Sequence, residues 1–92
     1  MDGYSEFFIE NGELVAHVEL YAGNAVHSYD YRVDREQTDF LAMKLNVDNE
    51  EDLVKVLTAK FSVGNGVIGF FEKNGITGIV ENKEYADTSS DV

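Results

Sequence analysis

The first third of the chain alternates between apolar and polar residues, as half-buried β-strands do. Asn11-Gly12 separates two such stretches and is typical of a two-residue type I′ hairpin turn, because both turn residues adopt positive φ. A two-residue turn there places Ile9 opposite Leu14 and Phe7 opposite Ala16. The apolar side chains of both stretches then share one face, so the turn and the alternation predict the same register.

A second turn at Gly23-Asn24 continues this apolar face onto a third strand, with Val18 opposite Tyr29 and Leu14 opposite Val33. We therefore predict a three-stranded antiparallel meander over about residues 4–33. The reverse face is acidic with aromatic interruptions, and we expect it to meet solvent or a partner. The residues expected on the inward face are Phe7, Ile9, Leu14, Val18, Tyr29 and Tyr31.

Residues 34–61 carry apolar side chains at the spacing of one helical face. Asp34 and Gln37 form a capping-box pattern at the start of a first helix, and Asp48–Glu51 marks the start of a second. The acidic residues of this second start lie where the helix dipole favours negative charge. The expected buried stripes are Phe40, Leu41 and Leu45 in the first helix and Leu53, Val54, Leu57 and Phe61 in the second.

Residues 62–82 are compatible with two structures. In the first, Asn74-Gly75 closes another hairpin, which would mix apolar and polar side chains on both faces. In the second, Gly75 takes the left-handed position after a short helix that buries Val67, Phe70 and Phe71, and a strand follows over 77–82. We favour the second. The fold class is then α+β: a meander with two or three short helices on one face and an additional C-terminal strand. We expect one domain over residues 1–85 and a frayed polar tail over 86–92.

The charge balance narrows the range of partners. The 92 residues include 18 Asp and Glu but only seven Lys and Arg, a net charge of -11. This field repels nucleic-acid phosphates and anionic lipid surfaces and attracts basic protein grooves. The basic residues are also scattered along the chain, so no basic groove for nucleic acid is visible. We expect neither direct nucleic-acid binding nor membrane binding.

Motifs for cofactors and metals are absent from the sequence. The chain has no cysteine, which excludes disulfides and thiolate metal sites and fits a cytoplasmic location. The first residues have neither the basic nor the apolar region of a secretory signal, which favours the same location. A calcium loop beginning at Asp48 would need Gly and Glu where Leu53 and Ala59 stand. No Lys follows the glycines at 64 to 78 as a phosphate loop requires, so we expect no cofactor.

One row of the predicted sheet contains candidate chemistry. The register aligns Glu6, His17 and Asp30 on adjacent strands, with Ser28 in the next row. Two carboxylates beside an imidazole can hold a metal or raise the pKa of a general base. A flat, exposed sheet face lacks the concavity that excludes water from an active site, so we favour cross-strand pairing over catalysis. A small hydrolase or metal enzyme that uses these residues remains an alternative.

The leading hypothesis is a non-enzymatic, acidic interaction protein that binds and inhibits a basic protein, such as a nuclease or another nucleic-acid-binding complex. Small phage-type inhibitors of host defence nucleases, including anti-CRISPR proteins and other nucleic-acid mimics, are similar in size and charge, although no shared motif identifies a family. Two alternatives are an immunity protein for a cationic nuclease toxin and an oligomerisation module; the sequence leaves monomer and homodimer open. The predicted partner-binding residues are Glu6, Phe8, Glu10, Glu13, Glu19 and Tyr21 on the sheet, and Asp48, Glu50, Glu51 and Asp52 at the second helix start.

Overall fold

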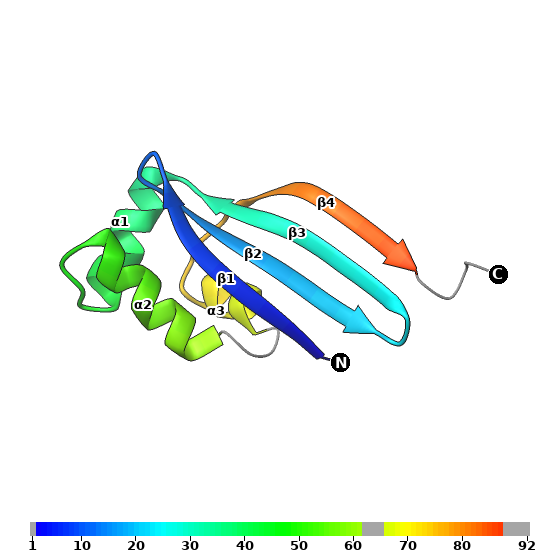
Figure 1. Cartoon of the computed structure of the whole chain (residues 1–92). Helices are drawn as coiled ribbons and strands as arrows, with labels where there is room; N and C mark the ends of the chain where they lie inside the picture. The colour runs from blue at the N-terminus through cyan, green and yellow to red at the C-terminus, as the bar shows by residue number, and fades with distance from the viewer. Residues whose placement is uncertain (1, 62–65, 88–92) are drawn as a thin grey trace.

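The computed structural model describes residues 2–61 and 66–87 and has an α+β fold, as predicted (Figure 1). Four antiparallel strands form one sheet in the order β1-β2-β3-β4. Three helices connect the third strand to the fourth. The elements are β1 (Asp2–Glu10), β2 (Glu13–Ala22), β3 (Ala25–Val33), α1 (Arg35–Lys44), α2 (Glu50–Phe61), α3 (Val67–Lys73) and β4 (Ile79–Asp87).

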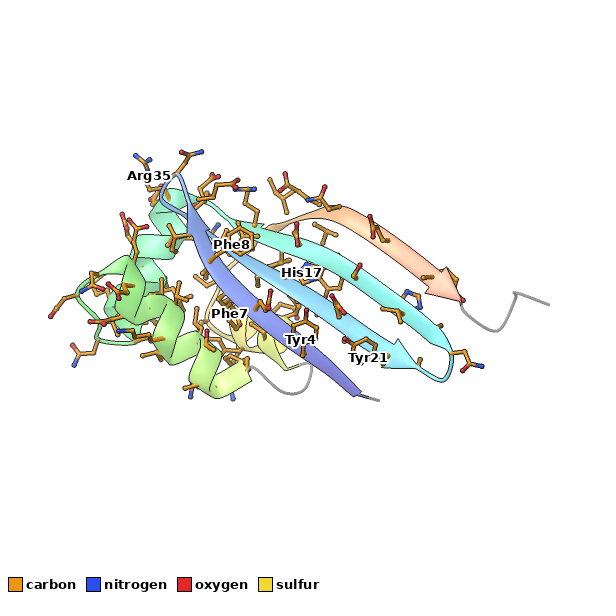
Figure 2. The ribbon with its side chains drawn as sticks, viewed as in Figure 1. Tyr4, Phe7, Phe8, His17, Tyr21 and Arg35 are labelled. Atoms are coloured by element: carbon orange, nitrogen blue, oxygen red, sulfur yellow. The ribbon has the colours of Figure 1, made fainter. Side chains whose placement is uncertain are left out.

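The register of the N-terminal meander is the predicted one. Ile9 pairs with Leu14 in β1 and β2, and Val18 pairs with Tyr29 in β2 and β3. Asn11 and Gly12 have φ of 54° and 80°, as a type I′ turn requires. Arg35 lies over this turn (Figure 2), where its Nη2 donates to the carbonyl of Asn11 at 2.8 Å. The helical layer is therefore tied to the turn that sets the register.

All three helices lie on one side of the sheet, where their apolar faces form a single core with the inward-facing strand residues (Figure 1). Within the predicted stripes, Leu41, Leu53 and Leu57 are fully buried. The expectation for Phe40 is wrong, because its side chain lies at the margin of the stripe and is 41 % exposed. The buried side chains of the core are Phe7, Leu14, Ala16, Val18, Tyr31, Val33, Leu41, Leu53, Leu57, Val67, Phe71 and Ile76.

Both predicted helix starts are present. The backbone N–H of Gln37 donates to the carboxylate of Asp34 at 2.8 Å, so Asp34 is the N-cap of α1. At the second start, the backbone N–H of Asp52 donates to the Asn49 side chain at 2.8 Å. The Gln37 side chain has a further role, because it both donates to and accepts from the backbone of Thr77, at 2.7 Å in each case. This pair of hydrogen bonds holds the segment before β4 against α1.

The segment after α2 forms a helix and a strand, which is the favoured alternative. Gly75 has a φ of 75° and Ile76 is buried. The N–H groups of Gly75 and Ile76 donate to the carbonyls of Glu72 and Phe71 at 3.1 and 2.8 Å, the pattern of a Schellman C-cap. Residues 62–65, including Gly64, lie outside the described residues.

The end of the C-terminal strand differs from the prediction. β4 continues to Asp87 instead of ending near residue 82, because Ala86 and Asp87 pair with Val26 and Ala25 of β3. Ala86 and Asp87, expected in the frayed tail, therefore belong to the sheet, and 88–92 lie outside the described residues. A bulge interrupts the β3–β4 register between Ser28 and Asp30, where Asn82 has a φ of 52°.

The sheet is longer than the helical layer. The molecule extends 51 × 22 × 21 Å, and the β2–β3 turn projects beyond the helices (Figure 1). His27, near this turn, lies on the inward face of the sheet by register, opposite Leu20. It is exposed, because no helix of the described residues reaches it, and its ring packs edge-on against Tyr85 at 4.5 Å.

Candidate interaction surface

The sheet face opposite the helices, called here the open sheet face, carries most of the predicted partner-binding residues. Tyr4, Phe8, His17 and Tyr21 lie on it along β1 and β2 (Figure 2). No helix of the described part of the chain covers it. By register its residues are Tyr4, Glu6, Phe8 and Glu10; Glu13, Val15, His17, Glu19 and Tyr21; Val26, Ser28, Asp30 and Arg32; and Ile79, Glu81, Glu84 and Ala86.

His17 lies between two carboxylates at the middle of the open sheet face. Its Nε2 is 2.9 Å from Glu19 and its Nδ1 is 2.7 Å from Asp30. A protonated imidazole donates at both nitrogens, whereas a neutral one donates at only one. The hydrogen bond to Glu19 therefore raises the pKa of His17; partial burial opposes this effect, and the hydrogen bond to Asp30 adds to it.

The register places Glu6, His17 and Asp30 in one row, as predicted, but only the side chains of His17 and Asp30 are in contact. Glu6 pairs with His17 through the backbone, yet it has no hydrogen-bond or ion-pair partner among the described residues. Glu19, two residues along β2, takes the second imidazole nitrogen instead. The long Glu19 side chain can reach His17 on the same face of its own strand, whereas Glu6 points to solvent.

Glu19 is the centre of a small hydrogen-bond network. The hydroxyl of Tyr21 donates to one of its oxygens at 2.7 Å, and the hydroxyl of Tyr4 donates to the other at 3.2 Å. The hydrogen bond from His17, followed by that from Tyr21, lowers the pKa of Glu19. The hydrogen bond that Tyr21 donates to Glu19 also raises the pKa of Tyr21 to about 12. Glu19 and Tyr21, both predicted partner-binding residues, are thus held in fixed positions and are not freely exposed.

Arg32 organises the other end of the open sheet face. Its Nε is 2.8 Å from Glu81, its Nη1 is 3.1 Å from Glu13 and its Nη2 is 2.8 Å from Glu10. One guanidinium therefore joins β1, β2 and β4 through three carboxylates. Sequence reasoning missed this role, although the register already placed Arg32 on the same face as Glu10 and Glu13.

Phe8 is the most exposed aromatic side chain of the open sheet face that was predicted to bind a partner, at 42 %. It lies in one row with Val15 and Arg32. Val15 is fully buried even though no helix of the described residues lies on this face, so its neighbours on the sheet shield it from water. Phe8 thus exposes its ring next to a buried valine in the same row of the sheet.

The acidic start of α2 is the second predicted cluster. Asp48, Glu50 and Glu51 are exposed, and Glu51 lies 3.5 Å from Lys55 one turn later. Asp52 is partly buried and belongs to the N-terminal cap with Asn49. The two predicted clusters approach each other at β1, because Glu50 and Glu51 line an open hollow together with Ile9.

Across residues 2–61 and 66–87, no group of three or more His, Asp and Glu side chains is arranged to hold a metal ion. In the same residues, no helix is both long enough and apolar enough to cross a membrane.

No family model, curated protein or solved structure matches the chain. The open sheet face and the start of α2 are therefore the features that indicate a function.

Proposed function

We propose that this protein binds a basic, nucleic-acid-binding protein through its open sheet face and inhibits it by occupying the groove that contacts phosphates. The observation that carries the proposal is the imbalance of charge on this face. Among the described side chains of this face, one guanidinium, that of Arg32, and one imidazole, that of His17, stand among seven carboxylates. These are Glu6, Glu10, Glu13, Glu19, Asp30, Glu81 and Glu84.

The arrangement of these carboxylates favours binding over mere solubility. Neighbouring strands are about 4.8 Å apart, and side chains two residues apart on one strand are about 6.7 Å apart, so the charges form a regular array. A basic groove that reads a phosphate backbone also meets regularly spaced negative charge. Hydrogen bonds from Arg32 hold Glu10 and Glu13 across the strands, and Glu19 is held by contact with His17 on its own strand. Groups that are already ordered lose less conformational entropy when a partner binds.

Aromatic side chains supply the apolar part of the surface. Phe8 exposes its ring beside Glu6 and Glu10 on the same strand. Tyr4 and Tyr21 expose part of their rings while their hydroxyls bind Glu19. Aromatic anchors surrounded by charged residues are typical of protein interfaces, where the anchors slow dissociation and the charges guide association.

Affinity capture from a host lysate at physiological salt, with the protein as bait, tests this proposal. We expect a basic protein to be retained, and we expect its binding to a labelled oligonucleotide to fall when this protein is added. Glu6→Lys should weaken both effects, whereas the control Glu72→Lys, an equal charge change on the exposed surface of α3, should not. Retention of no basic protein, or equal behaviour of the two variants, would count against the proposal. A captured toxin nuclease would identify the inhibitor as an immunity protein.

A further inference from the structure

We infer that a second copy of this chain docks on the part of the inner sheet face that the helices leave uncovered. The inner face is the side of the sheet on which the helices pack. The sheet is longer than the helical layer, so the strand ends near the β2–β3 turn carry no helix of the described residues (Figure 1). This surface, called here the bare inner face, consists by register of Leu20 and Ala22 of β2, Ala25, His27 and Tyr29 of β3, and Val80, Lys83 and Tyr85 of β4.

The exposure of the inward side chains shows where the helical layer ends. Along β3, Tyr31 is buried, Tyr29 is half-buried and His27 is exposed. The same change runs along β2 from the buried Val18 to the exposed Ala22. Both strands remain paired throughout these positions. The sheet therefore continues past the end of the core and offers an ordered surface there.

The bare inner face is largely apolar, although the chain as a whole is strongly acidic. Tyr85 is 59 % exposed and Val80 is 51 % exposed. Tyr29, Val80 and Lys83 line an open hollow together with Ile68 of α3. The described side chains of this surface include no carboxylate, whereas the open sheet face has seven. Exposed apolar side chains that gather on one surface are typical of a protein contact site.

The bulge in β4 produces this separation of charged and apolar residues. β4 pairs with β3 as far as Glu81 and again from Glu84, and the two residues between them interrupt the register. A one-residue change of register moves every following side chain to the other face. The bulge thereby places Glu84 on the open sheet face and Tyr85 on the bare inner face. Without it, the carboxylate and the ring would exchange faces.

The shape of the bare inner face is complementary to itself. Leu20, His27 and Tyr85 form one row across β2, β3 and β4. In a two-fold dimer the same surface of both copies is in contact. An axis that crosses the strands at this row would place Tyr29 of one copy over Ala25 of the other. A large side chain then faces a small one on both sides of the axis, as in a well-packed interface between two sheets.

The sequence positions of the charges agree with this pairing. Lys83 and Asp87 stand two residues to either side of Tyr85 on β4. The same axis would bring position 83 of one copy over position 87 of the other, so opposite charges correspond at both ends of β4. A basic partner, in contrast, meets Lys83 here and seven carboxylates on the open sheet face. These charges therefore select a second copy for the bare inner face.

The size of the surface sets the expected affinity. Four strands about 4.8 Å apart, over the length of Ala25–Tyr29, cover roughly 300 Å² in projection. Stable interfaces bury about 800 Å² on each partner, so we expect a dissociation constant on the order of 100 µM. The dimer would keep both open sheet faces directed outward on opposite sides. It could therefore bind two basic sites at once, which raises the overall affinity without new contacts.

Sedimentation equilibrium of the full chain from about 5 µM to about 1 mM tests the inference. We expect the mass to rise from one copy, 10.3 kDa, toward two copies. Raising the salt from about 50 to about 500 mM should tighten the dimer several-fold, because it screens the repulsion between two chains of net charge -11. This is the opposite of the salt effect expected for a basic partner, so the two associations can be told apart.

Two neighbouring positions of β4 provide a matched pair of variants. Tyr85→Glu adds a carboxylate to the bare inner face and should weaken the dimer at least about tenfold. Ala86→Glu makes a similar change at an exposed residue on the open sheet face and should weaken it less than about threefold. Equal effects of the two variants would overturn the inference. If Tyr85→Glu does not fold, cross-linking decides.

Cross-linking identifies the surface in contact, because the chain has no cysteine of its own. His27 lies on the row of the proposed axis, so its two copies should be close together. A short bismaleimide should couple His27→Cys into dimers at least about tenfold faster than Ala86→Cys, which is also exposed but lies on the open sheet face.

Equal coupling of the two cysteine variants, or a chain that stays monomeric at about 1 mM, would overturn the inference. Neither result affects the proposed function. That function is measured separately, by capture of a basic protein and by the effect of Glu6→Lys on it.

Discussion

The Nδ1 atom of His17 lies 2.7 Å from the Oδ1 atom of Asp30 on the neighbouring strand, and its Nε2 lies 2.9 Å from Glu19. The side chains of His17, Glu19 and Asp30 are all less than one-third exposed. This contact makes the stability of the sheet depend on the protonation of one imidazole.

Replacing His17 by Gln should cost more stability at mildly acidic pH than at alkaline pH. The pKa of His17 is raised in the folded protein, so its contribution is complete below its ordinary pKa of about 6.5 and is lost as the pH rises through the folded-state value. The pKa values of Glu19 and Asp30 are lowered, so their contribution is lost only as the pH falls below about 4. We expect a loss of about 1 kcal/mol at pH 5.5 and clearly less at pH 8.5, measured by urea unfolding.

His27→Gln is the matched control for this experiment, because His27 is exposed and packs against the ring of Tyr85. Its effect should be small at both pH values. An equal loss for His17→Gln at pH 5.5 and 8.5 would show that the imidazole acts through packing alone.

Two glycine-to-alanine substitutions should have opposite effects on stability. A Cβ atom at Gly78 would lie 2.6 Å from the Tyr31 ring and 2.7 Å from the carbonyl oxygen of Arg32, so Gly78→Ala should lose about 1–3 kcal/mol. A Cβ atom at Gly69, within α3, meets nothing within 4 Å. Gly69→Ala should therefore gain up to about 1 kcal/mol from helix propensity. Thermal unfolding measures both, and a gain for Gly78→Ala would contradict the close approach of Gly78 to Tyr31 just before β4.

Ser5→Ala should stabilise the isolated protein by about 1 kcal/mol, because it removes a buried hydroxyl that has no partner in the described structure. Ser28→Ala, on the open sheet face and partly exposed, is the control and should change stability by less than about 0.5 kcal/mol. Urea unfolding compares the two variants. A loss of stability for Ser5→Ala would mean that the hydroxyl already has a partner.

Charge reversal should slow association with a basic partner at two separate places. Glu6→Lys tests the open sheet face, and Glu50→Lys tests the start of α2; both side chains are exposed. We expect each to lower the association rate several-fold, and raising the salt from 50 to 500 mM to lower it at least about tenfold, because charge steering is screened. Stopped-flow association measures these rates. A rate that is independent of salt would rule out recognition by charge.

Glu13 and Glu19 are unsuitable for this test, although the sequence predicted them as exposed binding residues. Glu13 accepts a hydrogen bond from Arg32, and Glu19 contacts His17, Tyr4 and Tyr21. Lysine at either position would break these contacts, and the change in folding would obscure the change in binding.

Phe8→Ala should raise the dissociation rate of the partner about tenfold or more, as expected for an aromatic anchor. Phe40→Ala is a close control, because Phe40 is 41 % exposed against 42 % for Phe8 but lies on α1, on the opposite side of the molecule from the open sheet face. Surface plasmon resonance with the captured partner measures both rates. Equal effects of the two substitutions would place the contact surface elsewhere.

The part of the fold that could be predicted is the part specified by short-range sequence patterns. The Asn11-Gly12 turn specifies one register because its two residues must adopt positive φ, and the alternation of β1 and β2 agrees with it. Asp34 caps α1, and Gly75 ends α3 with Ile76 buried against the core. Each of these features depends on residues only a few positions apart in the sequence.

The sequence could predict which residues share the open sheet face, but it could not predict which of their side chains contact each other. Period-two alternation already placed Glu10, Glu13, Glu19 and Arg32 on the same side of the sheet. Which carboxylate binds which cation depends on how far each side chain extends across neighbouring strands. Arg32 contacts Glu10, which lies two strands away, and Glu81, which belongs to a strand that the sequence located only approximately.

The sequence by itself determined the meander, its register, the starts of the first two helices and the acidic character of the open face, because turn geometry, alternation and capping act between near neighbours. Only the tertiary structure decided where β4 pairs, how far it continues, and which carboxylates are already engaged. Those outcomes depend on β3 pairing with β4 through a bulge at Asn82 and on α2 packing beside β1. They are set by packing between segments far apart in the chain, for which no local pattern exists.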